Sequence, residues 1–289
     1  MDADEIVGIQ ISCRPVSLDM SLILLSALIA VALSIAMAGA WAIVRKPGRS
    51  GWTDVIWSYA IGLAGVVASL APVGGPPTTR QYLVAALVAA WSLRLGTHIA
   101  VRTKGGGDDP RYAELRREWD AHFALRLFGF LQIQAAAALL LTISVLLAAR
   151  NPAPAIGWSD IAGALVLAVA IIGESIADLQ LRSFRGNPVN RRRICDAGLW
   201  GLSRHPNYFF EWLGWVAYPI IAIGPVGGFG WGWLALSGPL FMYWLLVHVS
   251  GVPPLEQHML RSRGDAFRDT QRRIRAFWPF PRRTEDLRR

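Results

Sequence analysis

Charge and cysteine are scarce in this sequence of 289 residues. Asp, Glu, Lys and Arg make up 17% of it, against 53% hydrophobic residues. A water-soluble chain of this length would need more polar surface, so the composition predicts an integral membrane protein that forms one bundle. The two cysteines, Cys13 and Cys195, fall on opposite sides of the membrane in the topology derived below, so no disulfide is expected. Residues 1–5 are acidic rather than basic, so no signal peptide is expected either.

Long apolar runs are abundant. A helix that crosses the bilayer needs about 20 mostly apolar residues. Seven stretches qualify, the sixth being the shortest: 18–44, 52–71, 82–101, 127–149, 158–181, 208–223 and 229–249. Turns rich in Pro and Gly separate several of them, and Trp recurs near their ends, as in interfacial belts. The sequence therefore predicts an all-α protein with one transmembrane domain over residues 1–289.

Lys and Arg are distributed very unevenly between the ends of these stretches. Arg14, Arg80 and Arg150 lie on one side, Arg94 lies inside the third stretch, and the rest of the 29 basic residues lie on the other side. Because cytosolic loops carry the excess of Lys and Arg, the N-terminus is expected outside and the C-terminus in the cytosol. We therefore expect a multi-pass protein of the cell inner membrane. The net charge of +9 then reflects topology rather than binding of nucleic acid.

The stretch from residue 174 to residue 211 carries the clearest functional signal. Glu174, Asp178, Arg182 and Arg185 are spaced by four, four and three positions, so one helix face presents all of them. Acidic residues inside an apolar span are costly and tend to mark a site. The alternative is a salt-bridged helix end whose arginines extend to lipid headgroups. For Glu174, which lies deeper in the span, the sequence favours a function.

The third apolar stretch places Arg94, His98 and Arg102 on one face, again four positions apart. An arginine inside a span must be paired, and the expected partner is an acidic residue of the fifth or sixth stretch. A structural ion pair between helices explains this arginine nearly as well as a ligand contact does.

A glycine-rich turn at residues 105–107 opens a helix that carries Arg111 and Tyr112. Such a turn suits a phosphate group, although a helix on the membrane surface is an alternative explanation. The expected topology gathers the ionisable and amide residues at the cytosolic side, which favours a site that faces the cytosol: Asp54, Arg94, His98, Glu174, Asp178, Asn207, Tyr208, Glu211 and Glu256.

The segment Arg204-His205-Pro206-Asn207-Tyr208, followed by Glu211, resembles the cofactor motif of the steroid 5-alpha-reductase superfamily, which includes sterol reductases. The whole chain resembles the bacterial branch of membrane proteins with a steroid 5-alpha-reductase-like C-terminal domain. The resemblance is strongest over residues 158–275, within the part expected to bind the cofactor, residues 158–280.

The resemblance implies that NADPH binds between the helices from the cytosolic side, without a metal. The family's Asn and Glu pair falls on Asn207 and Glu211, and its Asp and Arg fall on Asp178 and Arg185. Together with residues whose chemistry suits the nicotinamide and phosphate groups, the expected cofactor-binding set is Arg94, Arg111, Tyr112, Glu174, Asp178, Arg182, Arg185, Arg204, His205, Asn207, Tyr208, Glu211 and Glu256.

The steroid-binding residues of that family are not matched. The second stretch has no Glu or Gln, Trp91 stands where the family has a Tyr, and Glu174 replaces an Asn. We therefore expect an NADPH-dependent reductase of a C=C bond in a lipid, with an unsaturated acyl or isoprenoid chain favoured over a rigid steroid. Trp57 and Trp91 are expected to line the substrate, and the candidate proton donors are Tyr208, His98 and Asp54.

Two alternatives remain open. The isoprenylcysteine carboxyl methyltransferases share the Arg-His-Pro-x-Tyr element and bind S-adenosylmethionine, which has no phosphate group and gives the arginines that follow Asp178 no ligand. A non-catalytic lipid-binding protein would leave Glu174 and Glu211 buried without a purpose. No protein partner can be inferred from the sequence.

Overall fold

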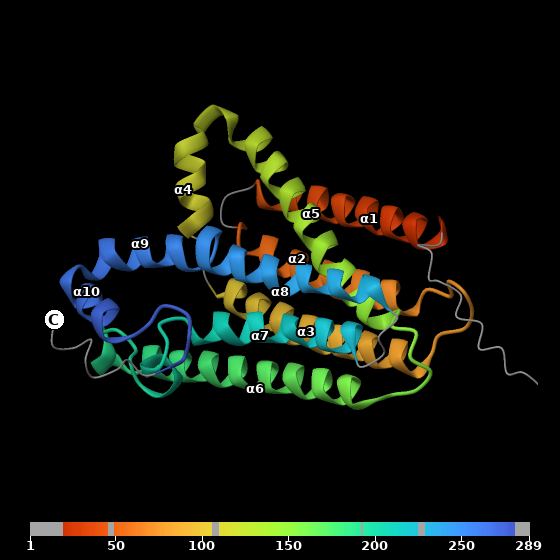
Figure 1. Cartoon of the computed structure of the whole chain (residues 1–289). Coiled ribbons are helices and arrows are strands. Elements are labelled where there is room, and N and C mark those ends of the chain that lie inside the picture. Colours follow the sequence, from red (N-terminus) through yellow and green to blue (C-terminus); the bar gives the residue numbers. More distant parts are fainter. Residues whose placement is uncertain (1–19, 46–48, 106–109, 192, 225–228, 281–289) are drawn as a thin grey trace, which may run out of the picture.

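The structure, a computed structural model, describes residues 20–45, 49–105, 110–191, 193–224 and 229–280. Long helices run roughly along a common axis, and one short helix lies across it (Figure 1). The described residues contain no strand. The α-helices are α1 Met20–Val44, α2 Trp52–Leu70, α3 Thr79–Lys104, α4 Pro110–Trp119, α5 Phe123–Ala149, α6 Trp158–Gly186, α7 Pro206–Ile223, α8 Ser237–Trp244, α9 Val252–Arg263 and α10 Asp265–Arg273.

Six helical segments are long and apolar enough to cross a membrane, so the chain is a multi-pass membrane protein by length and composition. They are Met20–Val44, Trp52–Leu70, Thr79–Lys104, Leu115–Ala149, Trp158–Gly186 and Gly230–Arg263. The predicted sixth span corresponds to α7, an 18-residue helix that contains Pro219 and Glu211 and is not among the six. The count of seven and the orientation stay predictions.

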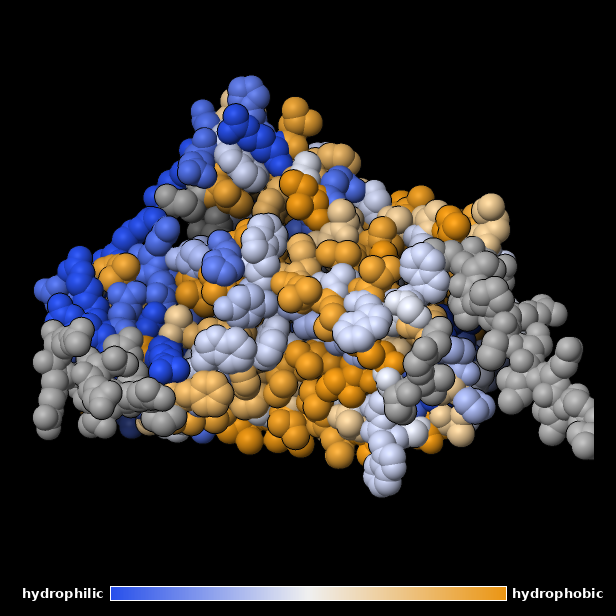
Figure 2. Space-filling model, in the orientation of Figure 1, coloured by the Kyte–Doolittle hydropathy of each residue, from blue (hydrophilic) through white to orange (hydrophobic). Residues whose placement is uncertain are grey.

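Helices at the outside of the bundle have one buried face and one exposed apolar face. In α1 the buried residues recur every three or four positions from Ile29 to Val44, while Leu28 and Ile35 on the opposite face are 60% and 67% exposed. Hydrophobic surface extends along the middle of the molecule, and hydrophilic surface gathers at the end that carries α9 and α10 (Figure 2). Such a distribution is typical of a protein whose sides face lipid.

Helices α6 and α7 lie unusually close together. A Cβ atom on Gly163 would lie 2.8 Å from the carbonyl oxygen of Ala217, and a Cβ on Gly173 would overlap the ring of Phe210. Glycine at these positions therefore lets the two backbones approach, as small residues commonly do between membrane helices. This contact sets the distance between Glu174, the next residue of α6, and the polar residues of α7.

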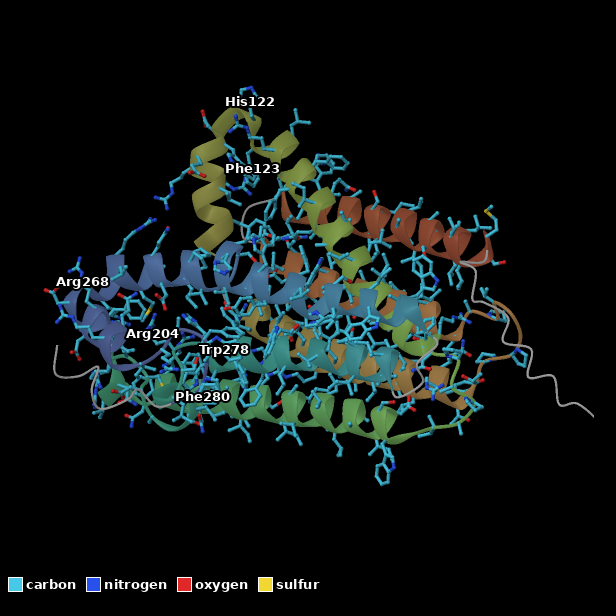
Figure 3. The ribbon with its side chains drawn as sticks, in the orientation of Figure 1. His122, Phe123, Arg204, Arg268, Trp278 and Phe280 are labelled. Atoms are coloured by element: carbon cyan, nitrogen blue, oxygen red, sulfur yellow. The ribbon has the colours of Figure 1, made fainter. Side chains whose placement is uncertain are left out.

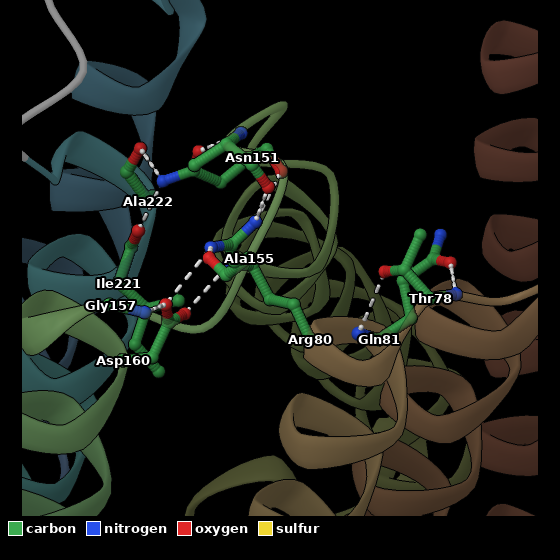
Figure 4. Close-up of polar contacts among 10 residues, drawn as sticks. Thr78, Arg80, Gln81, Asn151, Ala155, Gly157, Asp160, Ile221 and Ala222 are labelled. Atoms are coloured by element: carbon green, nitrogen blue, oxygen red, sulfur yellow. Dashed lines mark hydrogen bonds and ion pairs between the residues drawn. The ribbon is translucent and has the colours of Figure 1, made fainter.

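At the end of the bundle away from α10, the buried Arg80 of α3 joins several segments (Figure 4). Its Nε and Nη2 donate to the two carboxylate oxygens of Asp160 on α6, at 2.7 and 2.9 Å. Its remaining hydrogen bonds go to the carbonyl oxygens of Asn151, Ala153 and Ala155. The pair satisfies the backbone of the α5–α6 connection, so these two charges are structural.

Helix α4 and the start of α5 form an arm that projects from the bundle, with His122 and Phe123 at its tip (Figures 1 and 3). Arg116 of α4 lies 4.1 Å from the centre of the Phe123 ring and donates to the carbonyl oxygen of Arg45, at the end of α1. Tyr112 is buried and packs edge-to-face with Phe130 of α5. These contacts attach the arm to its neighbours.

Candidate functional site

A cluster of ionisable side chains lies between α3 and α6, near the end of the bundle that carries α10. Arg94 Nη1 lies 2.5 Å from Oε1 of Glu174, and Nη2 forms a close ion pair with Asp178. Nε donates to the hydroxyl of Ser175 at 3.3 Å. The guanidinium is mostly buried, with a side chain 13% exposed. The sequence-based prediction that Arg94 pairs with acidic residues of the fifth stretch is confirmed for Glu174 and Asp178.

Glu211 of α7 is held by two tryptophans. The indole N–H of Trp91 donates to Oε2 at 2.9 Å, and that of Trp215 donates to Oε1 at 3.0 Å. The two rings pack edge-to-face, with centroids 4.9 Å apart. Glu211 is buried, and each of its carboxylate oxygens accepts a hydrogen bond from one neutral donor.

These two groups form one electrostatic unit. Glu174, Asp178 and Glu211 all lie within electrostatic reach of the Arg94 guanidinium. The unit, which we call the acid cluster, therefore contains three carboxyl groups and one permanent cation. It is made from α3, α6 and α7, and the glycine-mediated approach of α6 to α7 brings its members together.

Four arginines gather on the side of the acid cluster where Asp178 and His98 lie. His98 Nε2 lies 3.4 Å from Asp178 and also interacts with the charges of Arg102 and Arg182. Arg185 interacts with the charges of Arg102 and Arg263. None of these four arginines has an ion-pair partner among the described residues. We call them the arginine rim; among the residues that the structure describes, it forms a positively charged surface beside the acid cluster.

Arg204, His205 and Glu256 form a second cluster. Glu256 Oε1 accepts from Nε and Nη2 of Arg204 at 2.8 and 2.7 Å and lies 3.1 Å from His205 Nε2, while Oε2 accepts from Gln271 at 2.7 Å. Arg204 also donates to backbone carbonyls of the C-terminal segment, including Ile274. This cluster connects the loop before α7 to α9 and α10, at the end of the molecule where Arg204 and Arg268 are labelled in Figure 3.

His205 is buried between this carboxylate and the ring of Tyr208, on which it stacks at 5.4 Å. Burial lowers the pKa of His205 below its ordinary value, against the opposing effect of Glu256. Nδ1 of the ring is buried and has no hydrogen-bond partner among the described residues. Arg204, His205 and Glu256 therefore make most of their polar side-chain contacts with one another and with the C-terminal segment.

Asn207 and Tyr208 begin α7, one turn before Glu211. The Asn207 side chain is half-buried and makes no hydrogen bond with the residues that the structure describes. It shares a helix face with Glu211, four positions away. Its carboxamide is thus available to a ligand at the edge of the acid cluster.

The remaining predicted site residues lie in other surroundings. Asp54 is in the first turn of α2, and Trp57 donates its indole N–H to the carbonyl oxygen of Gln134 on α5 at 3.0 Å. Tyr112 belongs to the packing of α4 against α5. The side chain of Arg111 lies outside the part of the chain that the structure describes.

Several members of the site were not predicted from the sequence. Trp215 follows Glu211 by four positions, and this spacing was a usable signal for a hydrogen bond along α7. Arg263 is the last residue of α9, which continues the line of α8 toward the end of the bundle that carries α10 (Figure 1), and its interaction with the charge of Arg185 joins residues far apart in the sequence, which no local pattern reveals. No group of three or more His, Cys, Asp or Glu residues with the geometry of a metal site occurs among the described residues.

Residues 40–274 match the model of a family described as a protein of unknown function, DUF1295. The chain belongs to this family. No curated protein and no solved structure shows a significant match. The family match spans the acid cluster, the arginine rim and the second cluster, so all three are features of the region that defines membership.

Proposed function

We propose that the chain is a membrane-embedded, NADPH-dependent reductase of a C=C bond in a lipid. The proposal extends the membership in DUF1295 to the steroid 5-alpha-reductase-like chemistry that the Arg204–Glu211 segment resembles. Bound NADPH would supply a hydride to one carbon of the double bond. The residues of this chain would hold the cofactor, exclude water and provide a proton.

The arginine rim is the observation that carries the proposal. Arg102, Arg182, Arg185 and Arg263 come from three helices and are not neutralised by acidic partners among the described residues. Like charges held together repel one another, so such a group is favoured where an anionic ligand binds. The pyrophosphate and the 2′-phosphate of NADPH would provide this charge through paired N–H donors.

Asn207 and Glu211 suit the other end of the same cofactor. A free carboxamide both donates and accepts hydrogen bonds, as the carboxamide of nicotinamide requires. Glu211 is fixed by two indole donors, so its orientation does not depend on the ligand. The acid cluster next to Asn207 would lie beside the ring that carries the hydride.

A lipid substrate is supported by the surface next to the cluster. An apolar groove of about 420 Å³ runs along α6 and is closed by Leu199 of the turn before α7 and by Phe210 of α7; its α6 lining includes Ile172, Gly173 and Ile176. Gly173 immediately precedes Glu174, and Ile172 is 58% exposed on the apolar side of the molecule. A chain dissolved in the bilayer would reach the cluster from this side without an aqueous entrance. The positive end would face the cytosol of the cell whose inner membrane holds the protein.

The direct test is calorimetric titration of the purified protein with NADPH, NADH and S-adenosylmethionine. We expect NADPH to bind most tightly, and the double variant Arg182→Gln/Arg185→Gln to lose at least about tenfold in affinity, since each charge-assisted contact is worth about 1.5–3 kcal/mol. Arg268→Gln is the matched control, because Arg268 is 61% exposed and paired with Asp265 at a distance of 2.6 Å. Equal affinity for NADPH and NADH would contradict the assignment of the rim to the 2′-phosphate.

S-adenosylmethionine is included because one observation favours it. The acid cluster has three carboxyl groups for one guanidinium, and excess negative charge would suit the sulfonium cation of that cofactor. The rim would then have no ligand. Binding of S-adenosylmethionine without NADPH would replace the reductase proposal by a methyltransferase, and binding of neither would favour the non-catalytic alternative.

A further inference from the structure

We propose that Glu174 holds a proton in the resting protein and is the acid that protonates the substrate carbon. This inference rests on the proposed reductase function for the role of the proton, and on the acid cluster alone for its location. It differs from the sequence-based expectation, in which Tyr208, His98 and Asp54 were the candidate donors.

The charge balance inside the acid cluster favours a bound proton. Among the residues that the structure describes, Arg94 is the one permanent cation in direct contact with this cluster, and Glu174, Asp178, Glu211 and Arg94 are all buried or nearly so. With all three acids ionised, the interior of a membrane protein would carry an excess of negative charge. Uncompensated charge is expensive in such surroundings, and neighbouring carboxyl groups respond by sharing protons.

The hydrogen bonds identify which acid keeps the proton. Asp178 contacts both Arg94 and His98, and Glu211 accepts one N–H bond on each oxygen. These contacts stabilise a carboxylate. Within the described part of the chain, Glu174 has one ion-pair partner, the guanidinium that also pairs with Asp178. Glu174 is therefore the least stabilised as an anion and the most favoured as a neutral acid.

A buried hydroxyl on α7 points to a ligand or water in the same region. Tyr218 follows Glu211 by seven positions, lies on the same helix face and interacts with the Glu211 charge. The residue is 1% exposed, and its hydroxyl has no hydrogen-bond partner among the described residues. An unpaired buried hydroxyl is costly, so a polar group delivered to this position would be bound favourably.

The chemical step then balances. The hydride forms a C–H bond at one carbon of the double bond. The π electron pair of the double bond shifts to the other carbon. This second carbon takes the proton as the O–H bond of Glu174 breaks, so the lipid gains two hydrogens while the reduced nicotinamide is oxidised. The Glu174 carboxylate left behind stays next to Arg94, which stabilises the new charge.

Reprotonation would come from the cytosolic side through His98 and Asp178. His98 is half-exposed and lies 3.4 Å from Asp178, so it connects the cluster to solvent. The charged groups that face it from the neighbouring helices are Arg94, Arg102, Arg182 and Asp178. His98 therefore lies where a proton can pass between solvent and the Asp178 carboxylate.

The location of the proton can be measured without any cofactor. Infrared spectra of the purified protein, prepared with glutamate carrying heavy carbon at its carboxyl group, should show a protonated glutamic acid carbonyl band near neutral pH. The band should disappear in Glu174→Gln. If that variant does not insert, Glu174→Asp keeps an acid at the position and should replace the labelled glutamic band by an unlabelled aspartic one. A wild-type protein without such a band would overturn the inference.

Variants of Glu211 provide the control. Glu211→Asp keeps the charge and removes the other buried glutamate, so the labelled band should persist; its loss would assign the proton to Glu211 and overturn the inference. Glu211→Gln removes one negative charge from the cluster, so the band should vanish at a lower pH than in the wild type. An unchanged titration would contradict the charge-balance argument.

Activity separates the two proposals. With an accepted lipid, Glu174→Gln should lower kcat by roughly 100- to 10,000-fold, the usual contribution of a general acid, and saturating NADPH should not restore it. A kcat close to that of the wild type would overturn the role of Glu174 as donor even if the band is present. Failure of the wild type to bind NADPH would instead refute the proposed function and leave the infrared result on the location of the proton standing.

Discussion

His205, at the N-terminal end of α7, makes the stability of the folded protein depend on pH. It is 3% exposed, with Glu256 on one side and the Tyr208 ring on the other. Burial disfavours the imidazolium more than the carboxylate favours it, so the pKa of His205 is lowered. The folded protein therefore prefers the neutral ring.

This leads to a prediction for pH dependence. As the pH falls below about 6.5, the unfolded chain takes up the proton before the folded one does, so the free energy of unfolding should decrease. Thermal unfolding of the detergent-solubilised protein at several pH values would measure this loss. The variant His205→Gln cannot titrate at this position, so its curve should fall less steeply over the same range. Parallel curves for the two proteins would contradict the assignment.

Trp91 has a hydrogen-bonding role that the sequence did not predict. The sequence placed it on the substrate wall, by its likeness to a tyrosine position, whereas its indole N–H donates to Glu211. A tyrosine at this position has a free hydroxyl to offer a substrate, but an indole has one donor, and here that donor is used. Trp91 therefore positions Glu211, and its indole N–H is not available to a ligand.

At the scale of the elements, the Arg80–Asp160 pair decides how α3, α6 and their connection meet at the end away from the acid cluster. The Asp160 carboxylate is fully buried and also accepts the backbone N–H of Gly157 at 2.8 Å. Asn151 extends the network by donating to the carbonyl oxygens of Ile221 and Ala222 at the end of α7. The pair thus contributes to holding α6 and α7 in the register that the acid cluster needs.

We predict that Asp160→Asn destabilises the protein by about 3–5 kcal/mol, because it leaves the Arg80 guanidinium buried without a counter-charge. Unfolding in mixed detergent micelles would measure the change. Asp265→Asn is the matched control: Asp265 is 95% exposed in its ion pair with Arg268, and such pairs contribute less than about 1 kcal/mol. Similar effects for both variants would show that the network is not structural.

At the scale of the whole molecule, the open question is whether α7 crosses the membrane. It runs beside α6 in the bundle, yet it contains polar residues at its start and is shorter than the six apolar segments. Six crossings would put both termini on one side, and seven would put them on opposite sides. The distribution of basic residues favours seven.

Reporter fusions would decide this. We expect a fluorescent protein at the C-terminus to fold in the cytosol, and alkaline phosphatase fused within residues 224–229, after α7, to be active outside. Phosphatase fused after Asn151, in the α5–α6 connection, is the positive control, because the predicted topology places that connection outside. An inactive phosphatase after α7, with an active control, would reduce the count to six.

The sequence alone determined the membrane class, the approximate positions of the apolar helices and the need of Arg94 for an acidic partner, with Glu174, Asp178 and Glu211 as the candidates. These properties depend on local composition and helical periodicity, which act over a few residues and survive in any packing. A short segment around Asn207 and Glu211 likewise indicated a family by resemblance. The match over residues 40–274 shows that the chain belongs to DUF1295.

Only the tertiary structure decided which polar groups share a site. The bonds from Trp91 to Glu211, the gathering of Arg102, Arg185 and Arg263, and the separation of the Arg204–Glu256 cluster all join residues far apart in the chain. They depend on how closely helices approach, which glycines such as Gly163 and Gly173 permit only against particular neighbours. Distances between helices are set by side-chain packing, so they cannot be predicted from the pattern of a single sequence.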